Sequence, residues 1–353
     1  MSLTNYRTLG RSGLIVSPLA LGTMTFGTPR WGTTDDVSAD IFRAYVEAGG
    51  NFIDTADVYS GGRSEELVGQ YVAAHGWRDR LVLGTKFGFG AARGNPHAGG
   101  NGRKQIYRAL EGSLRRLGTD YVDLYWLHVY DTVTPVEEVL QTLGDLVRAG
   151  RIRYFGFSDM PAWYATKAAV LAQAHGVPGP VAMQLEYSLV ERTIEREHLP
   201  AARECGLGLL PWSPLAGGFL AGKYAPATAG QGGEGRLNGA NPFGGEFTKF
   251  TPRNWQILTA LQAVAQELER PAAQVALAWV AGRPGTTAPL VGASRVAQLH
   301  ENIAALGLVL SPAHRQALDA ASAPAPTFPY GIFEPALNPA AVLGGTAVRG
   351  WPQ

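Results

Sequence analysis

An aspartate, a tyrosine, a lysine and a histidine stand out because each ends or closely follows a short apolar run. They are Asp54, Tyr59, Lys86 and His128. A buried carboxylate and a buried lysine form an ion pair, and a lysine cation beside a phenol lowers the tyrosine's pKa. An unperturbed tyrosine titrates near ~10 and is a poor proton donor at neutral pH. We expect the four to deliver a proton to a carbonyl oxygen, with His128 hydrogen-bonded to that oxygen.

Short apolar runs, each followed by helical spacing of apolar residues, place these side chains. We expect eight strands, near residues 18–23, 51–54, 81–86, 121–128, 153–158, 181–187, 208–213 and 288–292. Alternating strands and helices predict a parallel sheet. Eight such units predict an α/β fold closed into a (β/α)8 TIM barrel, rather than an open doubly wound sheet. The ends of the strands would then meet at one rim, where barrels place their chemistry.

The remaining segments fit as additions to one barrel domain spanning residues 1–353. They are an N-terminal β-hairpin at 6–17, a long loop at 217–250 with extra helices at about 252–268 and 272–281 after the seventh strand, and a Pro- and Ala-rich C-terminal tail at 323–353. The hairpin is indicated by two short segments around the turn-rich tetrad at 10–13. It could plug the barrel floor.

Composition narrows the class of protein. A net charge of +1 gives no general attraction to nucleic acid or to an anionic membrane surface. The single cysteine excludes an intrachain disulfide, and no apolar run approaches the length that spans a bilayer. The first residues do not read as a signal peptide. We expect a cytoplasmic protein with a small-molecule partner, and the sequence leaves the oligomeric state open.

The order of Asp54, Tyr59, Lys86 and His128 along the chain resembles the catalytic pattern of the aldo-keto reductase family, and the chain is similar to the bacterial aryl-alcohol-dehydrogenase-like branch within it. Further similar blocks are GFSDMPAW at 156–163, MQLEYSLVER at 183–192, LPWSPLAGGFLAGKY at 210–224 and VGASRVAQLHEN at 291–302. The resemblance implies an NADP-dependent oxidoreductase that reduces aldehydes or ketones, aryl aldehydes among them, without a metal. Tyr59 would donate the proton, Lys86 and Asp54 would support it, and His128 would position the carbonyl.

The resemblance also implies where NADP(H) binds: its nicotinamide at strand ends, its pyrophosphate after the seventh strand and its adenosine near the last strand. The residues so implied are Thr23, Met24, Ser158, Asp159, Gln184, Trp212, Ser213, Pro214, Leu215, Gly217, Lys223, Arg236, Gly292, Ser294, Arg295, Gln298, Glu301 and Asn302. A Gly-Ala-Ser-Arg turn that opens a helix, at 292–295, suits a phosphate and favours NADPH over NADH. At Asp159 many members of the family have Asn, which changes the expected contact with the nicotinamide amide.

Other functions remain open at this point. Lys86 could form a Schiff base in a lyase, and a metal-dependent hydrolase barrel would want paired histidines, although no His-x-His occurs. The chain also resembles, more distantly, the cofactor-sensing β subunits of potassium channels, which would be a non-enzymatic function. The G-x-G-x-x-G run at 230–235 follows no predicted strand and is taken as chance. Trp31, Tyr130 and Trp163 could line a substrate pocket or simply pack.

Overall fold

Eight parallel strands form the central sheet of the computed structural model, which describes residues 2–28, 32–227, 229–230, 236–238, 248–333, 341–346 and 348. In order around the sheet they are β10 (Leu290–Val291), β3 (Ala20–Gly22), β4 (Phe52–Asp54), β5 (Val82–Phe87), β6 (Val122–Leu127), β7 (Ile152–Ser158), β8 (Ala182–Glu186) and β9 (Gly208–Trp212). The sheet closes where Thr287, shortly before β10, donates its backbone N–H to Leu209 of β9 at 2.8 Å. The predicted (β/α)8 barrel is therefore confirmed.

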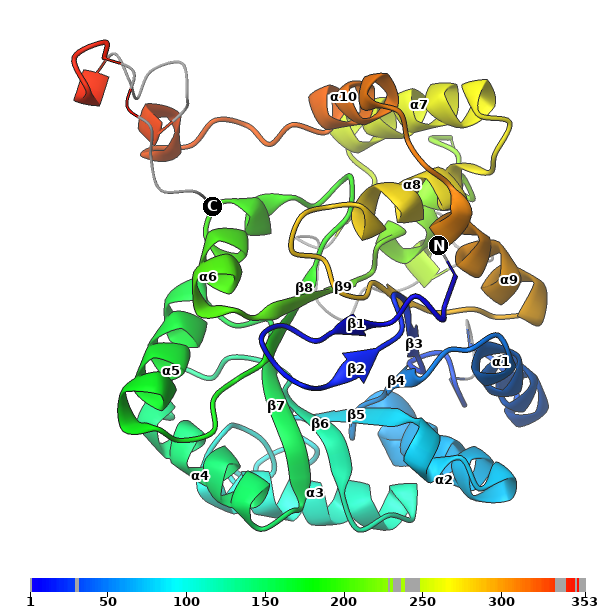
Figure 1. Ribbon diagram of the computed structural model, residues 1–353. Helices are drawn as coiled ribbons and strands as arrows, with labels where there is room; N and C mark the ends of the chain where they lie inside the picture. The colour runs from blue at the N-terminus through cyan, green and yellow to red at the C-terminus, as the bar shows by residue number, and fades with distance from the viewer. Residues whose placement is uncertain are drawn as a thin grey trace.

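Helices surround the strands in the predicted alternation (Figure 1). They are α1 (Asp35–Glu47), α2 (Arg63–His75), α3 (Arg103–Leu117), α4 (Val136–Arg148), α5 (Ala162–His175), α6 (His198–Cys205) and α9 (Val296–Ala304). Between β9 and β10 the chain adds α7 (Pro252–Glu267) and α8 (Ala272–Ala281), and α10 (Pro312–Ala321) follows α9. Of the described residues, none belong to a helix with the length and apolar character needed to cross a membrane.

Strand alternation divides the apolar side chains into two cores. Ile53 and Leu83 point outward and pack under the helices, whereas Phe52, Val82 and Trp126 fill the barrel interior. Because period-two alternation repeats along each strand, the residues two positions beyond Phe52 and four beyond Val82 also face inward at the rim. Those residues are Asp54 and Lys86, both fully buried.

The N-terminal hairpin closes one end of the barrel. Its strands β1 (Arg7–Thr8) and β2 (Ile15–Val16) pair antiparallel, and in Figure 1 they cross the middle of the ring of strands. A Cβ on Gly10 would lie 2.4 Å from the Val181 carbonyl oxygen, and Gly10 has φ +58°, so this turn needs a glycine to sit against the barrel. The hairpin thus covers one end of the barrel, and the opposite end, where the strands finish, is open to a ligand.

We expect Leu9→Ala to lower the free energy of unfolding by about 2–5 kcal/mol, because Leu9 is fully buried among the interior side chains. Ile15→Ala, on the same hairpin but 55% exposed, should change it by less than about 0.5 kcal/mol. Denaturant unfolding monitored by circular dichroism measures both. Equal losses in the two variants would show that the hairpin does not plug the barrel.

The long segment after β9 differs in part from the predicted loop. Two 3-10 turns, η4 (Ala216–Ala221) and η5 (Arg236–Asn238), fall largely within 217–250. Consecutive left-handed glycines, Gly217 and Gly218, allow the first of them to bend back on itself. Residues 228, 231–235 and 239–247 lie outside the described residues, as do Trp31 and most of the G-x-G-x-x-G run.

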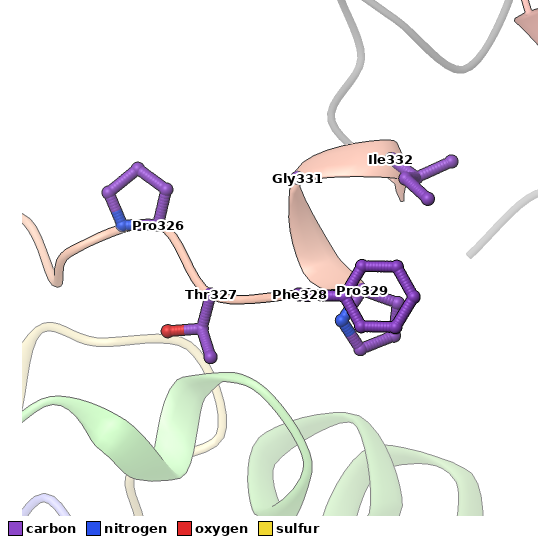
Figure 2. A pocket seen from close by; sticks show the side chains of 6 residues that line it. All are labelled: Pro326, Thr327, Phe328, Pro329, Gly331 and Ile332. Carbon is purple, nitrogen blue, oxygen red and sulfur yellow. The ribbon is translucent and has the colours of Figure 1, made fainter.

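The C-terminal tail leaves α10 and runs past α6, away from the ring of strands (Figure 1). The Tyr330 hydroxyl donates to Glu197, and Arg196 donates to the Ala325 carbonyl. A small cavity under this segment is lined by tail residues alone, from Pro326 to Ile332 (Figure 2). The described part of the tail therefore lies against the start of α6.

Candidate active site

Lys86, at the end of β5, has three partners for its three N–H donors. Its Nζ pairs with the Asp54 carboxylate, donates to the Thr55 carbonyl oxygen at 2.9 Å and donates to the Tyr59 hydroxyl at 3.2 Å. An ammonium group has only three donors, so this set is complete. Since the Tyr59 hydroxyl accepts from Lys86, its own proton remains for another acceptor.

Asp54 is held as firmly as Lys86. Its second oxygen accepts from the Gln184 side-chain amide at 3.0 Å, so both carboxylate oxygens are used. Burial acts to lower the pKa of Lys86, but Asp54 and Tyr59 together outweigh it and the pKa lies above its usual value. Lys86 therefore stays charged at neutral pH, within a buried pair whose charges compensate each other.

Tyr59 sits on η1 (Tyr59–Gly62), the turn between β4 and α2. Ser60, Gly61 and Gly62 follow with left-handed φ of 50°, 64° and 98°, and this reversal keeps the ring over Lys86, whose Nζ lies 4.8 Å from the ring centroid. The Ser60 hydroxyl donates to the Phe26 carbonyl at 3.1 Å, which fixes the turn to the loop after β3.

The expected depression of the Tyr59 pKa is wrong for this structure. Burial raises the pKa above its usual value, and the charge of Lys86 opposes this only in part because Asp54 acts in the opposite sense. Sequence reasoning counted the nearby cation but not the burial of the phenol. Tyr59 is thus a neutral phenol at physiological pH, and Lys86 favours the phenolate once the proton has left.

His128 follows β6 and faces Tyr59 across the rim. The two ring centroids lie 5.8 Å apart in an edge-to-face arrangement. The Phe89 ring also packs edge-to-face against the imidazole, with the centroids 4.8 Å apart. Burial, with a smaller contribution from Lys86, lowers the pKa of His128 well below its usual value, so the imidazole is neutral. Its Nδ1 is buried without a hydrogen-bond partner among the described residues. Phe89 was missed by sequence reasoning, because one phenylalanine in a Gly-rich loop carries no signal.

A barrel rim that joins Asp54, Tyr59, Lys86 and His128 can be compared with known families. The Aldo/keto reductase family model matches residues 18–323. The chain belongs to this family. It is 39% identical over 318 residues to an uncharacterized oxidoreductase of Bacillus subtilis (strain 168), covering 86% of this chain and 92% of that one.

Two further relatives of this aldo/keto reductase have more specific names. An aryl-alcohol dehydrogenase [NADP(+)] of Phanerodontia chrysosporium is 34% identical over 339 residues, covering 91% of this chain and 86% of that one. A probable voltage-gated potassium channel subunit beta of Oryza sativa subsp. japonica is 38% identical over 311 residues, covering 86% and 92%. The predicted family, and its aryl-alcohol-dehydrogenase-like relatives, are therefore confirmed.

The residues expected at the nicotinamide end of this aldo/keto reductase cluster beyond β7, β8 and β9. Ser158 is almost fully buried, and its hydroxyl has no hydrogen-bond partner among the described residues. Asp159, left-handed at φ 47°, accepts from the Trp212 indole at 3.0 Å. Gln184 has its NH2 committed to Asp54. An orphaned hydroxyl beside a carboxyl and a carboxamide suits a ligand with its own amide.

Thr23 and Met24 stand at the end of β3, with different surroundings. Thr23 is fully buried; its hydroxyl donates to the Asp54 carbonyl at 3.1 Å and lies 2.8 Å from the Ser64 hydroxyl. It braces the rim. The Met24 sulfur lies 3.6 Å from a guanidinium nitrogen of Arg236, which brings η5 over the loop after β3.

The segment expected at the pyrophosphate, from Ser213 to Lys223, consists of left-handed turns. Ser213, Gly217 and Gly218 all have positive φ, and the Ser213 hydroxyl accepts from the Gly217 N–H at 3.1 Å. Pro214 is buried and Leu215 half-buried, while the Lys223 side chain lies beside Gly218. Successive turns of this kind make concavities that bind anions.

The residues expected at the adenosine end surround the start of α9. Gly292, Arg295 and Glu301 are exposed. The backbone N–H and hydroxyl of Ser294 both donate to the Gln298 side-chain oxygen, at 2.9 and 2.8 Å. Asn302 is buried and donates to the Gly292 carbonyl at 3.3 Å, so it braces the turn. The exposed guanidinium at the helix start is the group best placed for a phosphate.

Proposed function

We propose that the protein is an NADPH-dependent carbonyl reductase that converts aldehydes or ketones to alcohols. The observation that carries the proposal is the contact between the Tyr59 hydroxyl and the Lys86 ammonium at 3.2 Å, across the rim from His128. Family membership makes oxidoreductase chemistry the expected class. The cofactor, the direction of the reaction and the roles below are our proposals.

Each of the four residues then has one task. Tyr59 gives its proton to the carbonyl oxygen, because its oxygen accepts from Lys86 and its proton remains for another acceptor. Lys86 stabilises the phenolate that remains, and Asp54 keeps Lys86 charged and in place. The neutral imidazole of His128 donates a hydrogen bond to the same carbonyl oxygen and sets its orientation. Bound NADPH would supply the hydride for the carbonyl carbon.

The residues at the rim fit NADPH by their chemistry. The Ser158 hydroxyl, which has no hydrogen-bond partner in the described part of the chain, would hold the carboxamide of the nicotinamide together with Asp159 and Gln184. The left-handed turns after β9 would take the pyrophosphate, with Lys223 and Arg236 beside it. Arg295 would take the 2′-phosphate at the start of α9, a geometry in which backbone N–H groups favour anions. This last feature supports NADPH over NADH.

We further propose that aryl carbonyls are substrates. Phe89 packs on the imidazole that would orient the carbonyl, and Tyr130, two residues after His128, is in edge-to-face contact with Trp163 at 6.1 Å. Aromatic walls favour planar aromatic ligands, because offset and edge-to-face ring pairs add about 0.5–1.5 kcal/mol beyond burial. A relative named aryl-alcohol dehydrogenase supports the same class.

The test is NADPH oxidation, followed by absorbance, over a panel of aromatic, aliphatic and sugar-derived carbonyls, repeated with NADH. We expect oxidation with aryl aldehydes and a preference for NADPH. The 38% identity to the rice potassium channel subunit beta favours a second candidate, a cofactor-binding subunit without turnover. Tight NADPH binding with no oxidation by any carbonyl would favour that candidate over ours.

Asp159 gives the proposal a pH dependence. Burial, opposed by the Trp212 hydrogen bond, raises the pKa of its carboxyl to about 7, although the side chain keeps contact with solvent. Below that pH it is protonated and can donate to the carboxamide oxygen; above it, it can only accept. We expect the affinity of the wild type for NADPH to fall as the pH rises from about 6 to about 8.5. The fall should exceed that of Asp159→Asn by about 2- to 10-fold, which corresponds to the loss of one hydrogen bond to the carboxamide oxygen.

Fluorescence titration of NADPH on both proteins across that range measures the difference. The 2′-phosphate titrates in both cases, so the comparison cancels its contribution. Parallel pH curves for the two proteins would mean that Asp159 does not contact the carboxamide as proposed.

A further inference from the structure

Arg116, from α3, lies directly beneath the turn that carries Tyr59. A Cβ built on Gly62 would come within 2.7 Å of Arg116 Cδ and 2.9 Å of its Nε. The guanidinium stem therefore packs against the backbone three residues after Tyr59. A Cβ on Gly61, one residue earlier, would meet no described atom within 4 Å. Contact from below is thus concentrated at Gly62.

A chain of side chains joins this contact to the strand that carries Lys86. Arg116 Nε donates to one Glu65 oxygen at 2.6 Å, and the Thr85 hydroxyl donates to the other at 2.5 Å. Glu65 is fully buried on the first turn of α2. Thr85 precedes Lys86 on β5 and faces the outside of the barrel, since neighbouring strand residues face opposite ways. The turn of Tyr59 and the strand of Lys86 thus share one ion pair behind the rim.

Asp57 brings a second carboxyl to the same guanidinium. Its backbone N–H donates to the Lys86 carbonyl at 3.1 Å, and one of its side-chain oxygens is buried without a partner among the described residues. Both Glu65 and Arg116 act electrostatically on it. Arg116 is thus ion-paired with Glu65, and its charge only partly offsets the effect of burial and Glu65, which raise the pKa of Asp57 to about 7.

The turn has a reason to need such support. Ser60 holds a left-handed φ of 50°, and a residue other than glycine in that region costs about 1–3 kcal/mol. Conformations of this kind persist only where the surroundings hold them. Above the turn, the Ser60 hydroxyl is bound to the Phe26 carbonyl; below it, Gly62 rests on Arg116.

We propose that Arg116 is a positioning residue: through Gly62 and the Glu65–Thr85 link it keeps the Tyr59 hydroxyl within hydrogen-bonding distance of Lys86. It touches neither substrate nor reacting atoms. The inference rests on the proposed role of Tyr59 as proton donor. A shift of about 1 Å in a reacting group can cost on the order of 100-fold in rate, so loss of this support should appear in turnover rather than in binding.

The test compares Arg116→Met, which keeps the apolar stem but loses the charge, with Arg115→Met, its exposed neighbour on α3. We expect Arg116→Met to lower kcat about 10- to 100-fold, with KM for the carbonyl and Kd for NADPH within about twofold. Hydrogen exchange should speed up in the peptide covering 59–62. Arg116→Lys should restore part of the turnover. Arg115→Met should change neither kcat nor the hydrogen exchange of residues 59–62.

Gly62→Ala offers a second route that keeps every charge. Its Cβ pushes on Arg116, whereas Gly61→Ala has the same left-handed requirement without the contact, so the first should lose more turnover and more exchange protection. Hydrogen exchange of residues 59–62 is measured without substrate. A wild type that reduces no carbonyl would therefore refute the proposed function, whereas the effect of Arg116 on the turn of Tyr59 could still be observed. Unchanged exchange at 59–62 in Arg116→Met, or exchange that rises equally throughout the protein, would overturn the inference.

Discussion

Tyr59→Phe is expected to lose about 10²–10⁴-fold in turnover while binding NADPH as tightly as the wild type. The substitution removes a single hydroxyl, whose oxygen accepts from Lys86 and whose proton therefore remains for another acceptor. Burial keeps the phenol protonated by raising its pKa, so the wild type should hold its proton donor throughout the neutral range. Steady-state kinetics with an aryl aldehyde, beside fluorescence titration of NADPH, separates the two effects.

The matched control is Tyr71→Phe. That hydroxyl, on α2, donates to the backbone carbonyl of Asp35 at 2.7 Å. It should retain turnover within about twofold, because Phe keeps the ring contacts of Tyr71 with Phe26 and Phe42 and the lost hydroxyl is bound to a backbone carbonyl. Wild-type turnover in Tyr59→Phe would refute the proton-donor role.

Lys86→Met should have two large effects, one on catalysis and one on stability. Turnover should fall by about 10²–10⁴-fold, because the phenolate loses its stabilising cation. Removing one partner of a buried ion pair costs about 3–5 kcal/mol, since Asp54 stays in the interior with its charge uncompensated. Both quantities are measurable on one preparation, by kinetics and by denaturant unfolding.

The pH dependence of that stability loss has a definite sign. Without Lys86, burial places the folded-state pKa of Asp54 above its unfolded value near ~4, so the folded protein binds more protons than the unfolded chain. The free energy of unfolding of Lys86→Met should therefore fall as the pH rises above about 4. The fall should end once the pH exceeds the raised pKa of Asp54 in the folded protein. Burial raises the pKa of Asp54 in the wild type as well, but the charge of Lys86 opposes this, so the wild type should show a smaller decline.

The double variant Asp54→Asn, Lys86→Met separates the two effects. It leaves no buried charge at the pair, so most of the lost stability should return. Turnover should remain low, because the cation beside Tyr59 is still missing. A double variant as unstable as Lys86→Met, or one that regains turnover, would contradict the account of this pair.

Sequence periodicity predicted the barrel and the place of the four rim residues for a simple reason. A residue at the end of a parallel strand has its depth set by strand length and its direction set by alternation, and both can be read locally. Strand length and alternation were sufficient to predict where Asp54 and Lys86 lie. Closure of the sheet depends on Thr287 reaching Leu209, a contact between distant segments, and the sequence pointed to it through the count of eight units, their roughly even spacing and the N-terminal hairpin.

Electrostatics and side-chain networks were beyond that reading. The direction of the Tyr59 pKa depends on how deeply the ring is buried, which the tertiary structure decides. Asp123, for which the sequence offered no account, accepts from Arg78 at 2.8 Å and from the Leu83 backbone at 2.9 Å, so it ties the start of β5 to its neighbour. Such pairs join residues far apart in the chain and leave no periodic trace.

The central claim is that this rim reduces a carbonyl with a proton from Tyr59 and a hydride from NADPH. The most direct measurement is the mass and isotope position of the alcohol formed from an aryl aldehyde with NADPH carrying deuterium at both C4 positions. The account predicts one deuterium on the former carbonyl carbon, with little labelled product from Tyr59→Phe in the same time. An alcohol without that label, or deuterium released into water instead, would contradict it.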